Sequence, residues 1–393
     1  MLLYSGGIDS MYAALQLRQF DFEVHALVAD VGQALKRDLQ SNAERLGLRL
    51  HVVNVQNTIC DDFIAKGILA NGLFNDHFPI ASSYTRPLIA SEAVKLAEKV
   101  HSTLLVHSAT PFQNSGARFN LSIRALAPHL NIFCPAVGEY TSREEKIAAL
   151  NKAGFSFAGE QPIYSVDENL WARVIENGTL EEPWLDIPNE GIFTWTVNPE
   201  KCKEPPMELR VGFEQGLPVS LDGKRMSLLE IIKDLNVRLG RYGIGRYTGL
   251  EDGSFGVKNP EIREAPAAAM LHQSHLQMEE MVLSSEELRV KRGLDREWTN
   301  LAVFGGWYSP LKAHLEAAIH SFNRDLTGSI KWRVTSGQIF PIAKDSPHAL
   351  YSARFPEFLE EFRPYSLNSF YQGKARLNRI GTPSAKNHEK ANP

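Results

Sequence analysis

The hexapeptide SGGIDS, from Ser5 to Ser10, lies between a short apolar run and a stretch with the periodicity of a helix. Gly6 and Gly7 have no β-carbon, so their amides can approach a ligand closely and their backbone can adopt positive φ. A helix that begins near Asp9 would direct its unpaired N–H groups and the positive end of its dipole at the same loop. These features predict a cradle for a phosphate group.

The sequence of this loop matches neither of two other glycine-rich loops that bind phosphate. No lysine follows the glycines, as it does in the loop that ends in Gly-Lys-Ser/Thr, and the spacing is not GxGxxG. The alternative interpretation is a plain turn with an Asp or Ser helix cap, which would be the better one for an isolated SGG. The choice depends on where the loop lies in the fold.

The first 155 residues alternate between strand-like and helix-like segments. The predicted strands are Met1–Tyr4, Glu23–Ala29, Leu48–Val55, Thr103–His107 and Asn131–Cys134. The predicted helices are Asp9–Arg18, Leu35–Leu46, Ile59–Leu73, Pro87–Val100 and Ser142–Ala153. This alternation predicts a parallel sheet covered on both faces, in which ligands bind beyond the carboxyl ends of the strands. SGGIDS lies at that end of the first strand, which favours the phosphate site.

The pattern changes near residue 157 to that of an α+β domain. The predicted strands are Ile192–Val197, Met207–Glu214, Leu217–Leu221, Ser329–Thr335 and Gln338–Ile342, with hairpin turns at Asp222–Gly223 and Ser336–Gly337. The predicted helices are Ser227–Leu239, the Glu264–Arg292 region and Pro310–Asn323. We therefore expect an α/β fold with a nucleotide-binding domain over 1–156, a substrate domain over 157–353 and an extension over 354–393 whose polar end is disordered.

Composition excludes several classes of protein. The 393 residues carry a formal net charge of −4, which gives no basic field for nucleic acid, and no apolar run is long enough to span a membrane. The three cysteines form no CxxC pair, so we expect no zinc site and a cytoplasmic location. His272 and His275 could suggest a metal pair, but no third ligand accompanies them, and a helix surface or subunit contact is the favoured interpretation. No metal site is predicted from these side chains.

SGGIDS resembles the SGGxD(S/T)S signature of the pyrophosphatase-loop ATP enzymes, with Met11 in place of the last serine. The other motifs are similar to those of argininosuccinate synthases. The matching segments are ADVGQ (Ala29–Gln33), ASSYTRPLIA (Ala81–Ala90), HSATPFQNSGARFN (His107–Asn120), YSVDENLWARVIENGTLEEPW (Tyr164–Trp184), YGIGRY around Gly243–Gly245, WYSPL (Trp307–Leu311) and SPHALY (Ser346–Tyr351). They run collinearly over about nine-tenths of the chain.

The resemblance implies an AMP-forming, ATP-dependent carbon–nitrogen ligase of arginine biosynthesis with an adenine nucleotide alpha hydrolase-like domain. ATP would adenylate the ureido oxygen of citrulline and release pyrophosphate, and the amine of aspartate would then displace AMP. Mg²⁺ and a homotetramer are also implied. The nucleotide contacts carried over by resemblance are Tyr4, Ser5, Gly6, Gly7, Asp9, Ser10 and Ala29, of which Asp9 and Ser10, together with Arg118, are the catalytic candidates.

The substrate residues agree with the family only in part. By resemblance, the citrulline positions are Phe78, Ser83, Asn114, Arg118, Ser165, Val174, Glu251 and Arg263, and the aspartate positions are Thr110, Asn114 and Ser115. Arg118 is the natural carboxylate clamp and Glu251 the natural ammonium partner. Compared with the family, Phe78 and Arg263 each replace a tyrosine, Val174 replaces a serine and Ser115 replaces an aspartate.

These departures leave several hypotheses open. The pocket could take another amine, or an electrophile whose extra negative group meets Arg263, because a site that has lost hydrogen-bonding groups discriminates against its old ligand. Arg263 could instead pair with Glu251 and fill the space. A tRNA-modifying enzyme and a non-catalytic nucleotide-binding paralogue are the alternatives from other classes. Outside the pocket, Asp167 and Asn169 are expected to tie a loop between domains, and the charged run from Glu279 to Arg296 to be a solvated helix face or a subunit contact.

Overall fold

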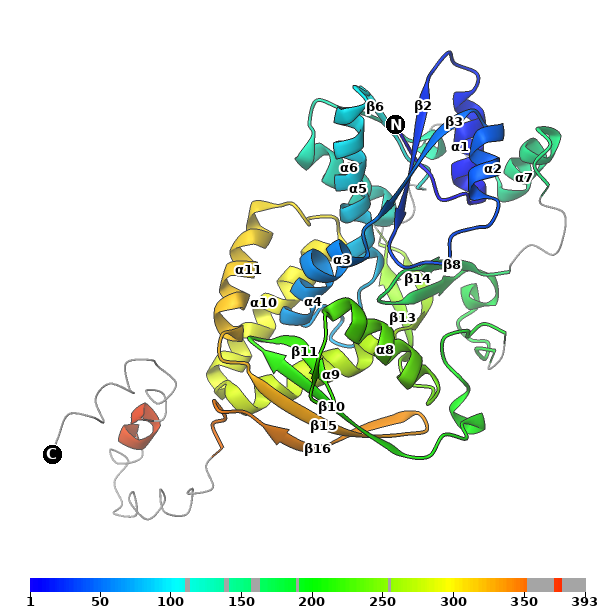
Figure 1. Ribbon diagram of the computed structural model, residues 1–393. Coiled ribbons are helices and arrows are strands. Elements are labelled where there is room, and N and C mark those ends of the chain that lie inside the picture. Colours follow the sequence, from blue (N-terminus) through cyan, green and yellow to red (C-terminus); the bar gives the residue numbers. More distant parts are fainter. Residues whose placement is uncertain are drawn as a thin grey trace.

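The computed structural model describes residues 1–109, 114–137, 141–156, 163–188, 191–253, 256–351 and 371–376 (Figure 1). The predicted substrate residue Thr110 lies outside these described residues, as does the predicted extension 354–393 except for 371–376. No helix within the described ranges is both long and apolar enough to cross a membrane.

The first half of the chain forms a five-stranded parallel sheet in the order β3-β2-β1-β6-β7. Its strands are β1 (Leu2–Leu3), β2 (Val24–Asp30), β3 (Leu48–Asn54), β6 (Leu104–Val106) and β7 (Asn131–Phe133). All five fall on segments that the sequence predicted as strands. The order reverses at β1, with β2 and β3 on one side and β6 and β7 on the other, so the loop after β1 lies at the edge where such sheets bind ligands.

Helices cover both faces of this sheet (Figure 1). Leu2 faces one apolar cluster with residues of α1 (Ile8–Leu17), α2 (Leu39–Arg45) and α7 (Arg143–Lys152). Leu3 faces the opposite cluster with residues of α5 (Ser82–Lys99) and α6 (Asn114–Leu126). Successive strand residues point to opposite faces, so two apolar neighbours in β1 serve two cores.

A segment between β3 and α5 leaves the sheet and packs against the second half of the chain. It contains α3 (Gln56–Thr58), the π-helical η1 (Ile59–Ile64), α4 (Ala65–Leu69), β4 (Leu73–Phe74) and β5 (Phe78–Pro79). Phe63 stacks on Trp307 with ring centroids 4.8 Å apart, and Phe74 meets Phe304 edge to face at 6.3 Å. The largest apolar cluster of the protein is therefore built from both halves of the chain.

The second half contains an antiparallel sheet in the order β12-β11-β10-β15-β16. Its strands are β10 (Met207–Glu214), β11 (Leu217–Leu221), β12 (Lys224–Arg225), β15 (Gly328–Thr335) and β16 (Gln338–Asp345), and its helices are α8 (Leu228–Gly240), α9 (Pro266–Val282), α10 (Ser285–Val303) and α11 (Pro310–Asn323). Both predicted hairpins are confirmed, because Leu221 pairs with Lys224 and Thr335 pairs with Gln338. Capping boxes begin α8 at Ser227 and α10 at Ser284.

A second sheet in this half was not predicted. It has the order β13-β14-β9-β8, with β8 (Ser165–Glu168), β9 (Arg173–Glu176), β13 (Arg246–Asp252) and β14 (Lys258–Glu264). Helix α6 was not predicted either. The region Glu264–Arg292, expected to be helical, is helical in α9 and in the first part of α10. Only Glu264 belongs to a strand, as the last residue of β14, and the helices are separated by Leu283 and Ser284.

Two further predictions were wrong. Residues 192–197 do not form a strand: the N–H groups of Thr194, Trp195 and Thr196 donate to the buried carboxylate of Glu264 at 2.8 to 3.1 Å, so that carboxylate replaces a neighbouring strand as their acceptor. His272 and His275 do not lie on a helix surface. Both are buried on α9, where the pKa values fall to about 3 and about 4 because burial disfavours the imidazolium.

Candidate active site

The loop after β1 is shaped for the close approach of a ligand. Gly6 has φ +68°, and a β-carbon at this position would lie 2.8 Å from Cδ1 of Leu39. Gly7 directly precedes α1, and no side chain in the described part of the protein caps that helix. The N–H groups of the first helical turn are thus open to an anion, which is the geometry that a phosphate cradle requires.

Hydrogen bonds within the loop hold it in this shape. The N–H of Ser5 donates to Oγ of Ser10 at 3.2 Å, and this hydroxyl donates to the carbonyl of Gly7 at 3.0 Å. The N–H of Gly7 donates to Oγ of Ser5 at 3.2 Å. The two serines therefore connect the strand end to the helix start across the glycine pair.

Two other predicted nucleotide contacts, Tyr4 and Ala29, and the substituted position Met11 differ in their surroundings. Tyr4 packs in the core beside the loop, and burial together with the charge of Asp38 raises its pKa to about 12. Met11 is 1% exposed and faces the same core, so its side chain points away from the loop. Ala29 lies near the carboxyl end of β2, where its carbonyl accepts from Nε2 of Gln33 at 2.8 Å.

Asp9 is the carboxylate nearest the start of α1. It is largely exposed, and its Oδ1 lies 2.7 Å from Nζ of Lys146 on α7. The described residues contain no group of three or more His, Cys, Asp or Glu side chains that could hold a metal ion. Mg²⁺ in nucleotide sites is held by phosphate oxygens and water with one or two carboxylates. Asp9 fits that role for an ion that arrives with a nucleotide.

The DENLW turn joins the two halves next to the loop that follows β2. The N–H of Leu170 donates to the carbonyl of Val31 at 2.9 Å, and a β-carbon on Gly32 would lie 2.4 Å from Cγ of Leu170. Oδ1 of Asn169 accepts from the N–H groups of Trp171 and Ala172 at 2.9 and 3.3 Å. The prediction that Asn169 ties this loop is confirmed.

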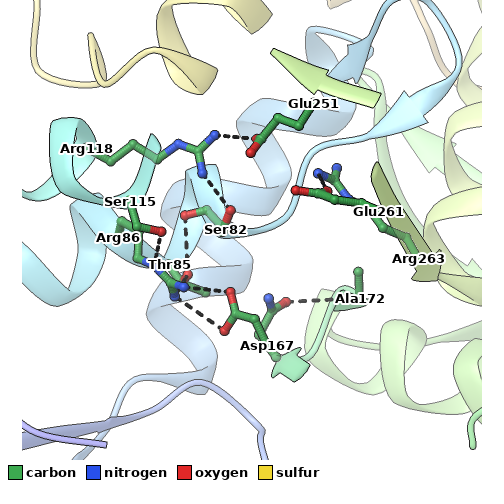
Figure 2. Close-up of polar contacts among 11 residues, drawn as sticks. Ser82, Thr85, Arg86, Ser115, Arg118, Asp167, Ala172, Glu251, Glu261 and Arg263 are labelled. Atoms are coloured by element: carbon green, nitrogen blue, oxygen red, sulfur yellow. Dashed lines mark hydrogen bonds and ion pairs between the residues drawn. The ribbon is translucent and has the colours of Figure 1, made fainter. Parts of the chain in front are cut away.

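Arg118 and Glu251, two of the predicted substrate residues, contact each other (Figure 2). Arg118 is 2% exposed, and its guanidinium donates to Oε1 of Glu251, to Oγ of Ser82 and to the carbonyl of Val303, each at 2.7 Å. Burial opposes ionisation of Glu251, but Arg118 and Arg263 outweigh it and hold the pKa of Glu251 below its usual value. The predicted carboxylate clamp and the predicted ammonium partner thus bind each other.

Arg263 is enclosed by three partners. Its Nη2 lies 2.7 Å from Oε2 of Glu261, its Nη1 donates to the carbonyl of Pro79, and its guanidinium carbon lies 3.9 Å from the centre of the Phe78 ring. The pair with Glu251 considered from the sequence is replaced by a pair with Glu261. Because Glu261 neutralises it, Arg263 adds no net positive charge to this region.

Two further glutamates lie beside this pair. Glu176 on β9 is directly opposite Glu261 on β14, and their carboxyl groups are hydrogen-bonded to each other. Burial and the neighbouring charge of Glu261 raise the pKa of Glu176 well above its usual value, and burial also raises the pKa of Glu261. We infer that Glu176 carries the proton of the pair.

Replacing Glu176 with glutamine is expected to flatten the dependence of stability on pH. Folding raises the pKa of this carboxyl group above 4.5, its pKa in the unfolded chain. Its contribution to stability is complete when the pH is below the pKa of the unfolded chain, and it is lost as the pH rises through the pKa of the folded protein. The amide of E176Q stays neutral, so the variant should lose less stability than the parent between pH 5 and 8. Urea unfolding at both pH values measures this, and equal losses in the two proteins would contradict it.

Arg86 ties the second sheet to α5. Its guanidinium contacts Oδ2 of Asp167 at 2.8 Å, Oγ of Ser115 at 3.2 Å and Oγ1 of Thr85 at 3.1 Å (Figure 2). The predicted role of Asp167 as a tie between the halves is confirmed. Ser115, predicted to contact aspartate, lies on α6 within this group.

The remaining predicted substrate residues surround the same region. Nδ2 of Asn114 donates to the carbonyl of Asp252 at 2.7 Å, which joins α6 to β13. Val174 is buried and pairs with Arg263 across β9 and β14. Ser83 is buried in the first turn of α5, whereas Ser165 is exposed at the start of β8.

Sequence reasoning missed four residues of the site, namely Ser82, Arg86, Glu176 and Glu261. A signal for Glu261 existed, because it stands two residues before Arg263, and residues two apart in a strand share a face. That signal required β14 to be recognised as a strand. Arg86 and Ser82 lay within the ASSYTRPLIA segment, but only contacts in space distinguish them from their neighbours.

Two family models match the chain. The model described as arginosuccinate synthase N-terminal HUP domain matches residues 1–155, and the one described as arginosuccinate synthase C-terminal domain matches residues 164–374. Together they cover both the SGGIDS loop and the residues around Arg118.

Curated relatives are similar over nearly the whole length. An argininosuccinate synthase of Hyperthermus butylicus is 36% identical over 96% of this chain and 98% of its own. Relatives of the same name from Pyrobaculum aerophilum and Pyrococcus furiosus are 35% and 34% identical, each over 93% of this chain. The similarity thus includes both halves and the site between them.

Proposed function

Since the chain belongs to the argininosuccinate synthase family, we propose that it is an ATP-dependent ligase that joins citrulline to aspartate and forms AMP. The observation that carries the proposal is the SGGIDS loop at the end of β1, whose first helical N–H groups are open to an anion, in a chain that matches the family over nearly its whole length. The buried Arg118–Glu251 pair supports the choice of an amino acid as substrate.

An amino acid carries both charges that the Arg118–Glu251 pair needs. Its α-carboxylate can replace Glu251 as the acceptor of Arg118, and its α-ammonium can replace Arg118 as the partner of Glu251. Each buried charge keeps an opposite partner in this exchange, which avoids the penalty of an unpaired ion. A ligand with only one of the two groups would leave one residue unpaired.

The loop residues are suited to the first chemical step. The ureido oxygen of citrulline forms a bond to the α-phosphorus of ATP. The bond between the α-phosphorus and the bridging oxygen breaks, and its electron pair leaves with pyrophosphate. Amides at Gly6 and the start of α1 stabilise the charge on the phosphates. Mg²⁺ held with the phosphates and Asp9 would supply further positive charge there.

The second step forms the carbon–nitrogen bond. The amine of aspartate attacks the activated ureido carbon, AMP departs with the electron pair of the carbon–oxygen bond, and the amine loses a proton. Asn114 and Ser115, on the first turn of α6, lie beside Arg118 and Arg86 and are proposed to position aspartate. A homotetramer remains a prediction from the family.

A pyrophosphate-release assay with the purified full chain tests the proposal. Release is expected to require ATP and citrulline together, and AMP should appear in equal amount once aspartate is added. Ornithine, which has the same amino-acid end but no ureido group, is the matched control and should give no release. Lack of citrulline-dependent pyrophosphate release would contradict the proposed reaction.

A further inference from the structure

Two lysines from distant parts of the chain reach the SGGIDS loop. Nζ of Lys36, in the turn before α2, donates to the carbonyl of Gly6 at 2.9 Å. Nζ of Lys146, on α7, contacts Oδ1 of Asp9 at 2.7 Å. One ammonium group therefore contacts the glycine pair and the other contacts a side chain of the first turn of α1.

The two lysines are held differently. Gly6 offers Lys36 a neutral carbonyl, so this contact leaves the charge of Lys36 without compensation. Lys146 is compensated by Asp9, but its side chain is only 14% exposed although it belongs to a short surface helix. A lysine on a flexible four-carbon stem can move from such contacts onto a phosphate without any change in the backbone.

The cradle needs positive charge from outside the loop. Pyrophosphate leaves ATP with several negative charges, whereas helix amides supply only about half a unit of positive charge. The sequence offers no lysine within SGGIDS, and Met11 points into the core. Within the described ranges of the chain, Lys36 and Lys146 are the cations in contact with loop atoms.

We propose that Lys36 and Lys146 bind the β- and γ-phosphates of ATP and stabilise the pyrophosphate that leaves. This inference deepens the proposed function and rests on it. The two ammonium groups act on the leaving group alone: the electron pair of the bond between the α-phosphorus and the bridging oxygen moves onto pyrophosphate, where both cations lie. They are substrate-binding residues of the first step and take no part in carbon–nitrogen bond formation.

Calorimetric titration of the full-length protein tests this assignment. K36M and K146M keep the length of the apolar stem and remove the charge. We expect each variant to bind ATP and inorganic pyrophosphate more weakly by a factor of about ten or more, because one charge-assisted hydrogen bond is lost. Each variant should bind AMP with the affinity of the parent. Lys152, which is exposed at the end of the same helix as Lys146, provides the matched control, and K152M should bind all three ligands like the parent.

The outcomes separate the inference from the proposed function. Parent-like ATP and pyrophosphate affinity in both K36M and K146M would overturn the inference while leaving the ligase intact. Equal weakening for AMP would also overturn it, because AMP lacks the β- and γ-phosphates. A parent protein that binds neither ATP nor pyrophosphate would instead contradict the proposed function. K146R keeps the positive charge, so it should bind ATP and pyrophosphate with most of the affinity of the parent. That result would show that K146M acts through the loss of charge.

Discussion

Replacing Arg118 with glutamine is expected to lower kcat/KM for citrulline by about a thousandfold. The guanidinium can give a substrate carboxylate two charge-assisted hydrogen bonds, each worth about 2 kcal/mol, and about 4 kcal/mol corresponds to a factor of about a thousand. Steady-state pyrophosphate release at varied citrulline concentration measures the effect. A loss of less than tenfold would contradict the role of Arg118 as carboxylate clamp.

Loss of folding must be separated from loss of binding, because Arg118 also neutralises Glu251. The double variant R118Q/E251Q removes both charges and leaves no unpaired ion, so it should be more stable than R118Q. Its activity should remain as low as that of the single variant. Recovery of activity in the double variant would show that Arg118 acts only by supporting the fold.

Replacing Lys291 with methionine is expected to destabilise the protein by about 3 to 5 kcal/mol, the usual cost of removing one partner of a buried ion pair. Lys291 is 1% exposed, and its ammonium contacts Glu279 at 2.7 Å, Asp295 at 2.9 Å and the carbonyl of Leu69 at 2.8 Å. Without it, two neighbouring carboxylates remain in the core. Urea unfolding at pH 8 measures the loss.

A surface lysine provides the control. Lys95 is 65% exposed and pairs with Glu92 along α5 at 2.6 Å, so K95M should change stability by less than about 1 kcal/mol. Burial already raises the pKa of Asp295 to about 6. The carboxyl groups left by K291M can take up protons as the pH falls, so the destabilisation should be smaller at pH 5 than at pH 8. An equal loss in K291M and K95M would contradict the importance of the buried network.

The same network shows where sequence reasoning failed. The charges between Glu279 and Arg296 were predicted to form a solvated helix face or a subunit contact. The prediction of a solvated face holds for Glu286, Glu287, Arg289, Arg292 and Arg296, which are exposed. Glu279, Lys291 and Asp295 instead face the core, where the side-chain amide of Asn71 donates to the carboxylates of Glu279 and Asp295 at 2.9 Å. Asn71 comes from the segment between β3 and α5, about two hundred residues away from these carboxylates in the sequence. No local sequence pattern predicts a partner at that distance.

The parallel sheet could be predicted because its signals are local. Each strand is a short apolar run between helical segments, and the chain order fixes which end of the sheet holds the loop. The sheet that carries Glu251 and Arg263 has polar strands: KNPEIRE in β14 has little of the alternation that marks a strand. Its residues become buried only through pairing with β9 and β13, which is tertiary information.

For the site, residue types were predictable but their pairing was not. Arg118 and Glu251 were singled out as separate ligands of one substrate, and the structure adds that they contact each other. Arg263 was considered as a partner of Glu251 or of a substrate anion, but Glu261 lies closer to its guanidinium. A pair of opposite charges two residues apart on one strand is easily missed when the strand itself is not recognised.

The segment from α3 to β5 has a consequence for how the molecule holds together. Its apolar side chains complete a core that mostly belongs to elements after residue 170, although two of the five strands of the parallel sheet, β6 and β7, follow the segment in the chain. Cutting the polypeptide near residue 156 would therefore divide this hydrophobic core between two fragments, and each fragment alone would expose its share of the core to solvent. Such fragments should remain associated after cleavage, and the intact protein should melt in a single cooperative step.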